Sequence, residues 1–192
     1  FFFRQRDIVG GDFLFLRDTP SGFLIAVADC EGHGVSGALM TMMVDSFLKL
    51  IIPGVSEDDP ATMLSELDRS IRSSMLTSEG ESRLQVGMEI GLCACFPDRK
   101  RLIFAGAGMP LYVLESEGTV QTIHGRKRAV GHRHRLEQQP FENIELSTEE
   151  STFFLVSDGF IDQAGGESGR AFGTKRLFEM ISGCSDARLG KG

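Results

Sequence analysis

Three aspartates stand where apolar, strand-like segments meet glycine-containing turns. Asp12 follows a Gly-Gly pair, Asp29 follows one apolar run, and Asp158 follows another with Gly159 behind it. Carboxylates at strand ends, where glycine lets the backbone approach closely, suit hard cations such as Mg²⁺ or Mn²⁺. Any one of them is also typical of a turn residue that caps nearby backbone amides. The three together, in an acidic chain, favour a metal site.

Two of these aspartates flank a predicted hairpin. Residues 13–16 and 22–28 are apolar and strand-like, and the turn-forming segment 18–22 separates them. Asp12 stands just before the first strand and Asp29 just after the second. The hairpin would therefore bring both carboxylates to related positions.

The other elements follow from periodicity and turn residues. Helical spacing of apolar residues predicts one helix that ends at Pro53-Gly54 and a second after Pro60. Short strands joined by short turns suggest an antiparallel meander, and the continuous run 153–156 predicts a strand buried on both faces. This order predicts an α+β fold with helices packed on antiparallel sheets. The remaining expected elements are strands 86–96, 101–107, 111–114 and 119–123, a polar excursion over 124–150, and a short helix around 173–182.

Composition limits the class of protein. The 192 residues fit one domain, and 41% hydrophobic with 24% charged residues is ordinary for a soluble protein. A net charge of −7 argues against a nucleic-acid binder. No apolar run is expected to approach the roughly 20 residues that cross a bilayer, so no direct membrane insertion is predicted. The four cysteines have no zinc-site spacing, and a reduced, structural role is favoured.

One glycine motif points toward a different chemistry. Residues 32–37 match G-x-G-x-x-G after a strand and before a helix, which is typical of a dinucleotide site. A dinucleotide fold needs a second strand after that helix, and here an acidic loop and another helix follow instead. Asp29 and Glu31 would also place negative charge against a pyrophosphate. A nucleotide-binding domain is therefore disfavoured.

Several segments occur in the order of the motifs of PPM-type (protein phosphatase 2C-like) metal-dependent phosphatases. They are most similar to the bacterial branch named after sporulation stage II protein E (SpoIIE). Residues 160–166 resemble the SiaA-like subgroup of signalling phosphatases. The segments that carry the resemblance are 9–13 (VGGDF), 27–39 (VADCEGHGVSGAL), 101–114 (RLIFAGAGMPLYVL), 157–159 (SDG) and 172–177 (FGTKRL).

This resemblance implies an αββα sandwich of two antiparallel sheets with two Mn²⁺ or Mg²⁺ ions between them. By the family's pattern Asp29 bridges both ions, and the backbone carbonyl of Cys30 is a ligand of the second. Asp158 binds the first ion, and Asp12 acts directly or through water. Asp12, Asp29 and Asp158 are thus the expected catalytic residues, and Cys30 joins them as a metal ligand.

The implied activity is hydrolysis of phosphoserine or phosphothreonine in a bacterial regulatory protein, by water that two metal ions activate. The expected partner is a phosphorylated regulator such as an anti-sigma-factor antagonist-like (STAS) protein. The expected location is the cytoplasm, either free or as the cytoplasmic domain of a membrane-anchored sensor, and a dimer is left open. The alternative is a pseudophosphatase that binds a phosphoprotein without turnover.

The chain also departs from the family's pattern. The family has one more metal-binding aspartate on a strand beyond the last helix, whereas this chain ends at Gly192 and Asp186 is too near the helix for that role. Residues 1–192 are therefore expected to be one C-terminally incomplete domain of a longer protein, with a weakened first metal site. His33 is left open between a general acid and a helix cap. The basic stretch 126–135 is interpreted as a docking surface for an acidic or phosphorylated partner.

Overall fold

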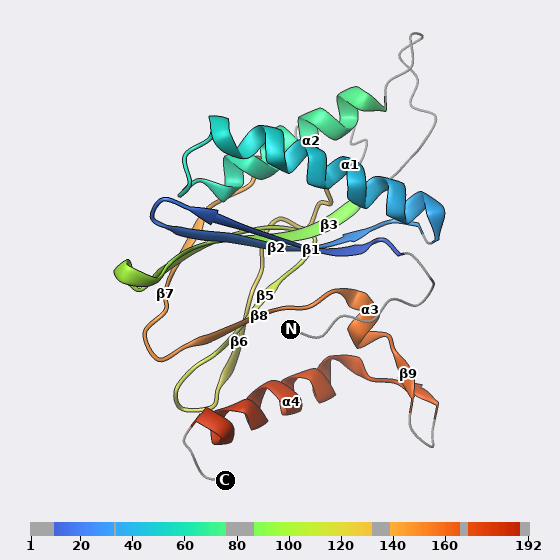
Figure 1. Ribbon diagram of the computed structural model, residues 1–192. Helices are drawn as coiled ribbons and strands as arrows, with labels where there is room; N and C mark the ends of the chain where they lie inside the picture. The colour runs from blue at the N-terminus through green and yellow to red at the C-terminus, as the bar shows by residue number, and fades with distance from the viewer. Residues whose placement is uncertain (1–9, 33, 76–86, 132–138, 166–168, 189–192) are drawn as a thin grey trace.

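The computed structural model describes residues 10–32, 34–75, 87–131, 139–165 and 169–188, which form four stacked layers. Two helices cover one face of a five-stranded sheet, a three-stranded sheet packs on its other face, and one long helix covers the second sheet (Figure 1). Apolar clusters fill the three interfaces between these layers. The predicted α+β fold, an αββα sandwich of two antiparallel sheets, is confirmed.

The first sheet begins with the predicted hairpin and has the order β1-β2-β3-β4-β7. Its last strand lies inside residues 124–150, which the sequence predicts as a polar excursion. That strand is only four residues long and alternates between half-buried and exposed positions, a signal too short to stand out. The strands are β1 (Asp12–Thr19), β2 (Gly22–Cys30), β3 (Met88–Phe96), β4 (Arg101–Ala107) and β7 (Ile144–Ser147).

The second sheet has the order β6-β5-β8. The predicted antiparallel pairing holds for β3 with β4 and for β5 with β6, but the meander is divided between two sheets, because the chain leaves the first sheet after β4 at Gly108, whose φ is +77°. The strand predicted to be buried on both faces is instead half-buried, since it pairs only with β5 and forms an edge of this sheet. The strands are β5 (Leu111–Leu114), β6 (Val120–Ile123) and β8 (Thr152–Leu155).

Capping residues and prolines set where the first two helices begin or end. Asp59 caps α2 by accepting a hydrogen bond from the Thr62 amide at 3.1 Å, and Pro60 occupies its first turn. A 3₁₀ turn containing Pro53 follows α1 directly. The helices are α1 (Val35–Ile51), α2 (Pro60–Ser74), the short α3 (Asp158–Ile161) and α4 (Gly173–Arg188), with 3₁₀ turns at Ile52–Gly54 and Pro97–Arg99 and a small hairpin of β9 (Ala164–Gly165) and β10 (Arg170–Ala171).

Helix α1 contains a longer apolar stretch than expected from the sequence. Within the described residues, the span Val35–Gly54 is long and apolar enough to cross a membrane, with a mean hydropathy of 1.6. The prediction that no apolar run approaches this length is therefore wrong. In the fold this helix packs on the first sheet through Met40, Val44 and Leu48, and core helices meet the same criteria of length and composition.

Candidate metal centre

A row of acidic side chains crosses one end of the first sheet. Asp12 on β1 is the cross-strand partner of Asp29 on β2, and Asp29 is the partner of Glu89 on β3. Directly opposed residues of antiparallel strands project from the same face, about 5 Å apart at Cβ. Alternation along β2 puts Ile25 on this face as well, and Ile25 packs in the cluster between the two sheets. The carboxylate row therefore faces the second sheet.

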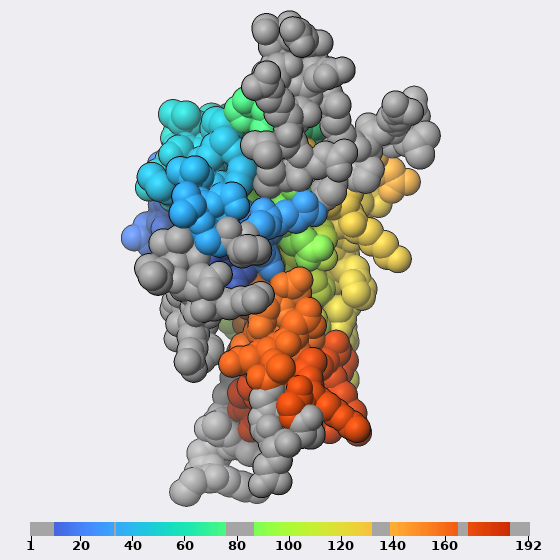
Figure 2. All heavy atoms as spheres, turned by 90° about the vertical axis from the view of Figure 1, so that its right-hand side faces the viewer, coloured from blue at the N-terminus to red at the C-terminus, as the bar shows by residue number. Residues whose placement is uncertain are grey.

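Asp158 approaches this row from the second sheet. It begins α3, directly after β8, and the hydroxyl of the preceding Ser157 donates to Oδ2 of Asp12 at 3.3 Å. A Cβ added to Gly159 would lie 3.5 Å from the same Asp12 oxygen. Figure 2 shows the N-terminal part of α1, the start of β3 and the segment around α3 gathered at this end of the molecule. The three predicted aspartates thus converge, from both sheets of the sandwich.

Burial, and then the proximity of these carboxyl groups, changes their ionisation. Burial raises the pKa of Asp29 to about 8, with further contributions from its hydrogen bond to Asp158 and from the charge of Asp12. Burial is also the main cause of the raised pKa of Asp12. The pKa of Glu89 is raised by burial and then by the charges of Asp158 and Glu31. Without a cation the centre therefore retains a proton near neutral pH.

The thiol of Cys30 faces away from the carboxylate row. The side chain points to the helix-covered face of the sheet, where it is buried. Burial, followed by the charges of Asp29 and Asp12, raises the pKa of this thiol to about 12. A protonated thiol is neither a metal ligand nor a nucleophile. Only the carbonyl oxygen of Cys30 remains as the ligand that the family's pattern predicts.

Gly11 is held against that carbonyl, and we expect Gly11→Ala to damage the centre. A Cβ at Gly11 would lie 2.5 Å from the Cys30 oxygen, so β1 would have to move away from β2 beside Asp12 and Asp29. The expected loss is about 1–3 kcal/mol of unfolding free energy, measured by urea denaturation. Gly54→Ala is the control, because a Cβ there meets nothing within 4 Å. Equal stability of the two variants would contradict this account.

Two acidic residues of this region were not among the predicted site residues. Glu89 is the one charged residue in the apolar strand β3, which is a signal that strand alternation could have revealed. Its side chain lies over Gly108, where a Cβ would come within 2.7 Å of it. Glu31 anchors the start of β3, since its Oε2 accepts from the Gly87 amide at 3.0 Å and its own amide donates to the Gly87 carbonyl.

Two arginines of the basic stretch make contacts within the chain. Arg126 is paired with Glu142 and donates to Gln139 and Pro140, and Arg128 is paired with the buried Asp68. Both guanidinium groups therefore hold the protein's own segments together. The docking role of the basic stretch stays a prediction that these contacts do not test. His33 and residues 132–135 lie outside the described residues, and Asp186 lies within α4, with its side chain outside them.

The chemistry of these groups fits a divalent cation. Mg²⁺ and Mn²⁺ prefer carboxylate and carbonyl oxygens, which the three aspartates and Cys30 present. The raised pKa of Asp29 reflects burial first and then the neighbouring carboxylates, and a bound cation would favour the charged form of this group. Within the described residues, no three His, Cys, Asp or Glu side chains already form a group of metal ligands. Mg²⁺ is commonly held by only one or two carboxylates, with water completing its shell.

The fold and this arrangement define a class of protein. Two antiparallel sheets between helices, with acidic groups where the sheets meet, are those of a PP2C-type phosphatase domain. Within that class the chain belongs to the Stage II sporulation protein E (SpoIIE) family, whose sequence profile matches residues 19–191. The family resemblance of the sequence motifs is confirmed.

Individual relatives refine this assignment. The chain is 31% identical over 144 residues to phosphoserine phosphatase RsbP of Bacillus subtilis (strain 168), which covers 72% of this chain and 33% of RsbP. It is 38% identical to the solved SiaA-PP2C domain of Pseudomonas aeruginosa, with a TM-score of 0.78 over 97% of this chain and 75% of that one. A structure of RsbX in complex with magnesium is 14% identical, with a TM-score of 0.57 over 97% of this chain and 83% of that one, and indicates the fold alone. The predicted likeness to SiaA is confirmed, and the chain spans about a third of the curated relative's length.

Proposed function

We propose that this chain is the catalytic domain of a metal-dependent serine/threonine phosphoprotein phosphatase. The observation that carries the proposal is the convergence of Asp12, Asp29 and Asp158 from two different sheets. A structural aspartate at a turn has no reason to approach two others, because their mutual repulsion costs free energy. The similarity to RsbP, a phosphoserine phosphatase, supports the same activity.

The proposed ligands follow the family's pattern. Asp29 would bridge two Mn²⁺ or Mg²⁺ ions, Asp158 would bind the first, the carbonyl of Cys30 the second, and Asp12 would act directly or through water. When bound, such ions polarise water and neutralise charge that develops on the phosphoryl oxygens. The magnesium in the RsbX structure supports Mg²⁺ as one candidate, and Mn²⁺ is the other.

The chain's own residues hold this arrangement in place. Ser157 orients Asp12 by donating a hydrogen bond to it, and Asp29 lies between Asp12 and Asp158. The protonated thiol of Cys30 is not a nucleophile, and the route we propose is direct attack by water without a covalent phosphoenzyme. Asp12, Asp29 and Asp158 would then act together, because bound cations would displace the proton that the centre retains and would offset the charge of the three carboxylates.

The proposed substrate is a regulatory protein phosphorylated on serine or threonine, of the anti-sigma-factor antagonist (STAS) type, in the bacterial cytoplasm. RsbP supports phosphoserine as the group removed, and the SiaA similarity supports a signalling role. The acidic chain, with a net charge of −7, makes a cation-bridged encounter with the phosphate more favourable than direct binding.

The test is hydrolysis of p-nitrophenyl phosphate and of a phosphothreonine peptide, with and without Mn²⁺. We expect turnover that requires Mn²⁺, is lost in Asp158→Asn, and persists in Asp98→Asn. Asp98 is the matched control because it lies just beyond the opposite end of β3 from Glu89. Absence of turnover from folded protein that still retains a phosphorylated partner would favour the pseudophosphatase alternative.

A further inference from the structure

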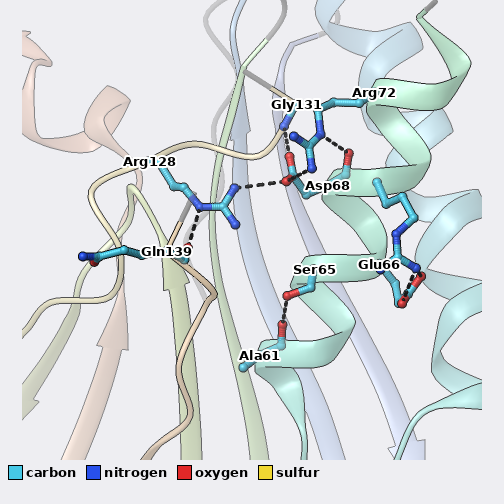
Figure 3. Close-up of polar contacts among 9 residues, drawn as sticks. Ala61, Ser65, Glu66, Asp68, Arg72, Arg128, Gly131 and Gln139 are labelled. Atoms are coloured by element: carbon cyan, nitrogen blue, oxygen red, sulfur yellow. Dashed lines mark hydrogen bonds and ion pairs between the residues drawn. The ribbon is translucent and has the colours of Figure 1, made fainter. Parts of the chain in front are cut away.

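A buried carboxylate outside the metal centre has an unusually complete set of partners. Asp68 on α2 is only 2% exposed, and it is the one charged side chain among the buried residues that the structure describes. Its Oδ2 accepts from Arg72 at 2.7 Å and from Arg128 at 3.0 Å, and its Oδ1 accepts from the Gly131 amide at 2.8 Å (Figure 3). The carboxylate thus joins its own helix to a distant segment of the chain.

Residues 125–131 form that segment, here called the crossing segment. The guanidinium of Arg128 lies 3.8 Å from the centre of the Phe141 ring, and its Nε donates to the Gln139 carbonyl at 3.3 Å. Only 14% of the Arg128 side chain is exposed, so its pairing with Asp68 is largely shielded from water. Shielding strengthens the attraction and fixes the position of the crossing segment against α2.

The crossing segment also binds the ends of the two strands beside the carboxylate row. The Arg126 amide donates to the Gly106 carbonyl and the Gly108 amide donates to the Arg126 carbonyl, both at 2.8 Å. Val130 exchanges two backbone hydrogen bonds with Met88, at 2.9 and 3.0 Å. Met88 precedes Glu89 in the chain, and Gly108 lies under the Glu89 side chain. The segment therefore spans β3 and β4 at the position of Glu89.

We propose that Asp68 is a positioning residue of the metal centre, which acts through Arg128 and the crossing segment on the end of β3 that carries Glu89. Stability alone is a poor reason for this carboxylate, since buried ion pairs are often no more stabilising than apolar side chains of similar size. What an apolar side chain cannot do is hold an arginine and a backbone amide in fixed directions. The expectation that Asp68 affects metal binding rests on the function proposed above.

The test compares Asp68→Asn with Leu64→Ala. Asparagine keeps the size of the side chain, but its amide group places a donor where Asp68 receives only donors. Leu64 is fully buried on the same helix one turn earlier, so its truncation destabilises the fold while leaving every hydrogen bond of Asp68 in place. Hydrogen exchange of residues 87–91 and 104–110 reports the strand ends directly. Calorimetric titration measures the affinity of the metal centre for Mn²⁺. Turnover measured against Mn²⁺ concentration separates that affinity from kcat.

We expect Asp68→Asn to speed hydrogen exchange in both stretches. We also expect it to weaken Mn²⁺ binding about 10-fold, which is the smallest loss typical of groups that orient metal ligands. Its kcat at saturating Mn²⁺ should stay within about twofold of the unchanged protein, whereas a merely structural role would lower kcat and leave the Mn²⁺ requirement alone. Leu64→Ala should lower the melting temperature and leave Mn²⁺ affinity unchanged.

Two results would overturn the proposal: unchanged exchange at the strand ends in Asp68→Asn, or equal weakening of Mn²⁺ binding by Leu64→Ala. Failure of the unchanged protein to bind Mn²⁺ at all would reject the proposed function. The exchange measurement would still decide whether Asp68 positions the end of β3.

Discussion

Replacing Asp29 with asparagine should abolish Mn²⁺-dependent hydrolysis and yet make the metal-free protein more stable. Asp29 is the proposed bridge between two cations, and a neutral amide cannot supply that charge. We expect turnover to fall by about 10²–10³-fold or to become undetectable, as for removal of a group on which the transition-state charge depends. The same substitution removes a carboxyl group that burial and two neighbouring carboxylates disfavour in its charged form.

The effect on stability should depend on pH in a defined direction. The pKa of Asp29 is about 8 in the fold and about 3.8 in the unfolded chain, so between these values the folded state binds more protons. Stability from this group is complete below about pH 4 and is lost as pH rises through about 8. The melting temperature of metal-free protein should thus fall from pH 5 to pH 8, and Asp29→Asn should flatten this fall. Because the cations displace the proton, Mn²⁺ affinity should rise over the same range.

Thermal melts at several pH values, in chelator and then in Mn²⁺, check this prediction. Asp98→Asn is the control, since it changes the same chemical group away from the carboxylate row. If Asp29→Asn lost stability in chelator as well as activity, Asp29 would be a structural residue and not the centre of a crowded acidic site.

Such a site illustrates how function can oppose stability. Asp12, Asp29 and Glu89 all have raised pKa values, with burial as the largest cause in each. The rest of the fold must hold them together against this cost, and local strain of this kind is typical of functional sites. The close approach of Gly11 to the Cys30 carbonyl and the hydrogen bond from Ser157 to Asp12 are two of the contacts that do so.

The sequence predicts the part of this site that depends on local structure. Asp12 and Asp29 flank a short hairpin, and a hairpin fixes which residues oppose each other, so their pairing follows from the turn alone. Asp158 is a candidate from its place after an apolar run, but only the family's pattern puts it with the other two, because no local rule brings a residue that follows the second sheet to the first. The pairing of Glu89 with Asp29 could not be predicted either, because it joins strands that two helices separate in the chain.

The fold shows the same division between local and long-range information. Periodicity predicts α1, α2 and most strands, because each pattern spans several residues. The division of the predicted meander into two sheets depends on Gly108, where the chain turns with a positive φ between β4 and β5. Arg126 pairs with Glu142, and Arg128 pairs with Asp68, which is distant in the chain. A charged stretch alone does not reveal such partners.

Truncation of Phe104 should have the largest effect on stability. Phe104 on β4 is fully buried between the two sheets, and its ring covers the cross-strand glycine pair Gly91 and Gly106. A Cβ on Gly106 would lie 2.6 Å from the ring and one on Gly91 would lie 3.4 Å from it, so the two glycines leave the room that the ring occupies. Phe104→Ala should therefore cost about 3–5 kcal/mol, a large fraction of the 5–15 kcal/mol of a typical domain.

The loss should also reach the metal centre, because Asp29 is on the first sheet, Asp158 follows a strand of the second, and Phe104 packs where those sheets meet. Urea denaturation measures the stability, and Mn²⁺ titration at low temperature, where the variant remains folded, measures the centre. Leu16→Ala is the control: Leu16 is on β1 but 62% exposed, and its truncation should change stability by less than about 0.5 kcal/mol. If Phe104→Ala bound Mn²⁺ as tightly as the unchanged protein, the alignment of the two sheets would not depend on this packing. Weaker binding would mean that the core between the sheets sets the geometry of a site at its edge.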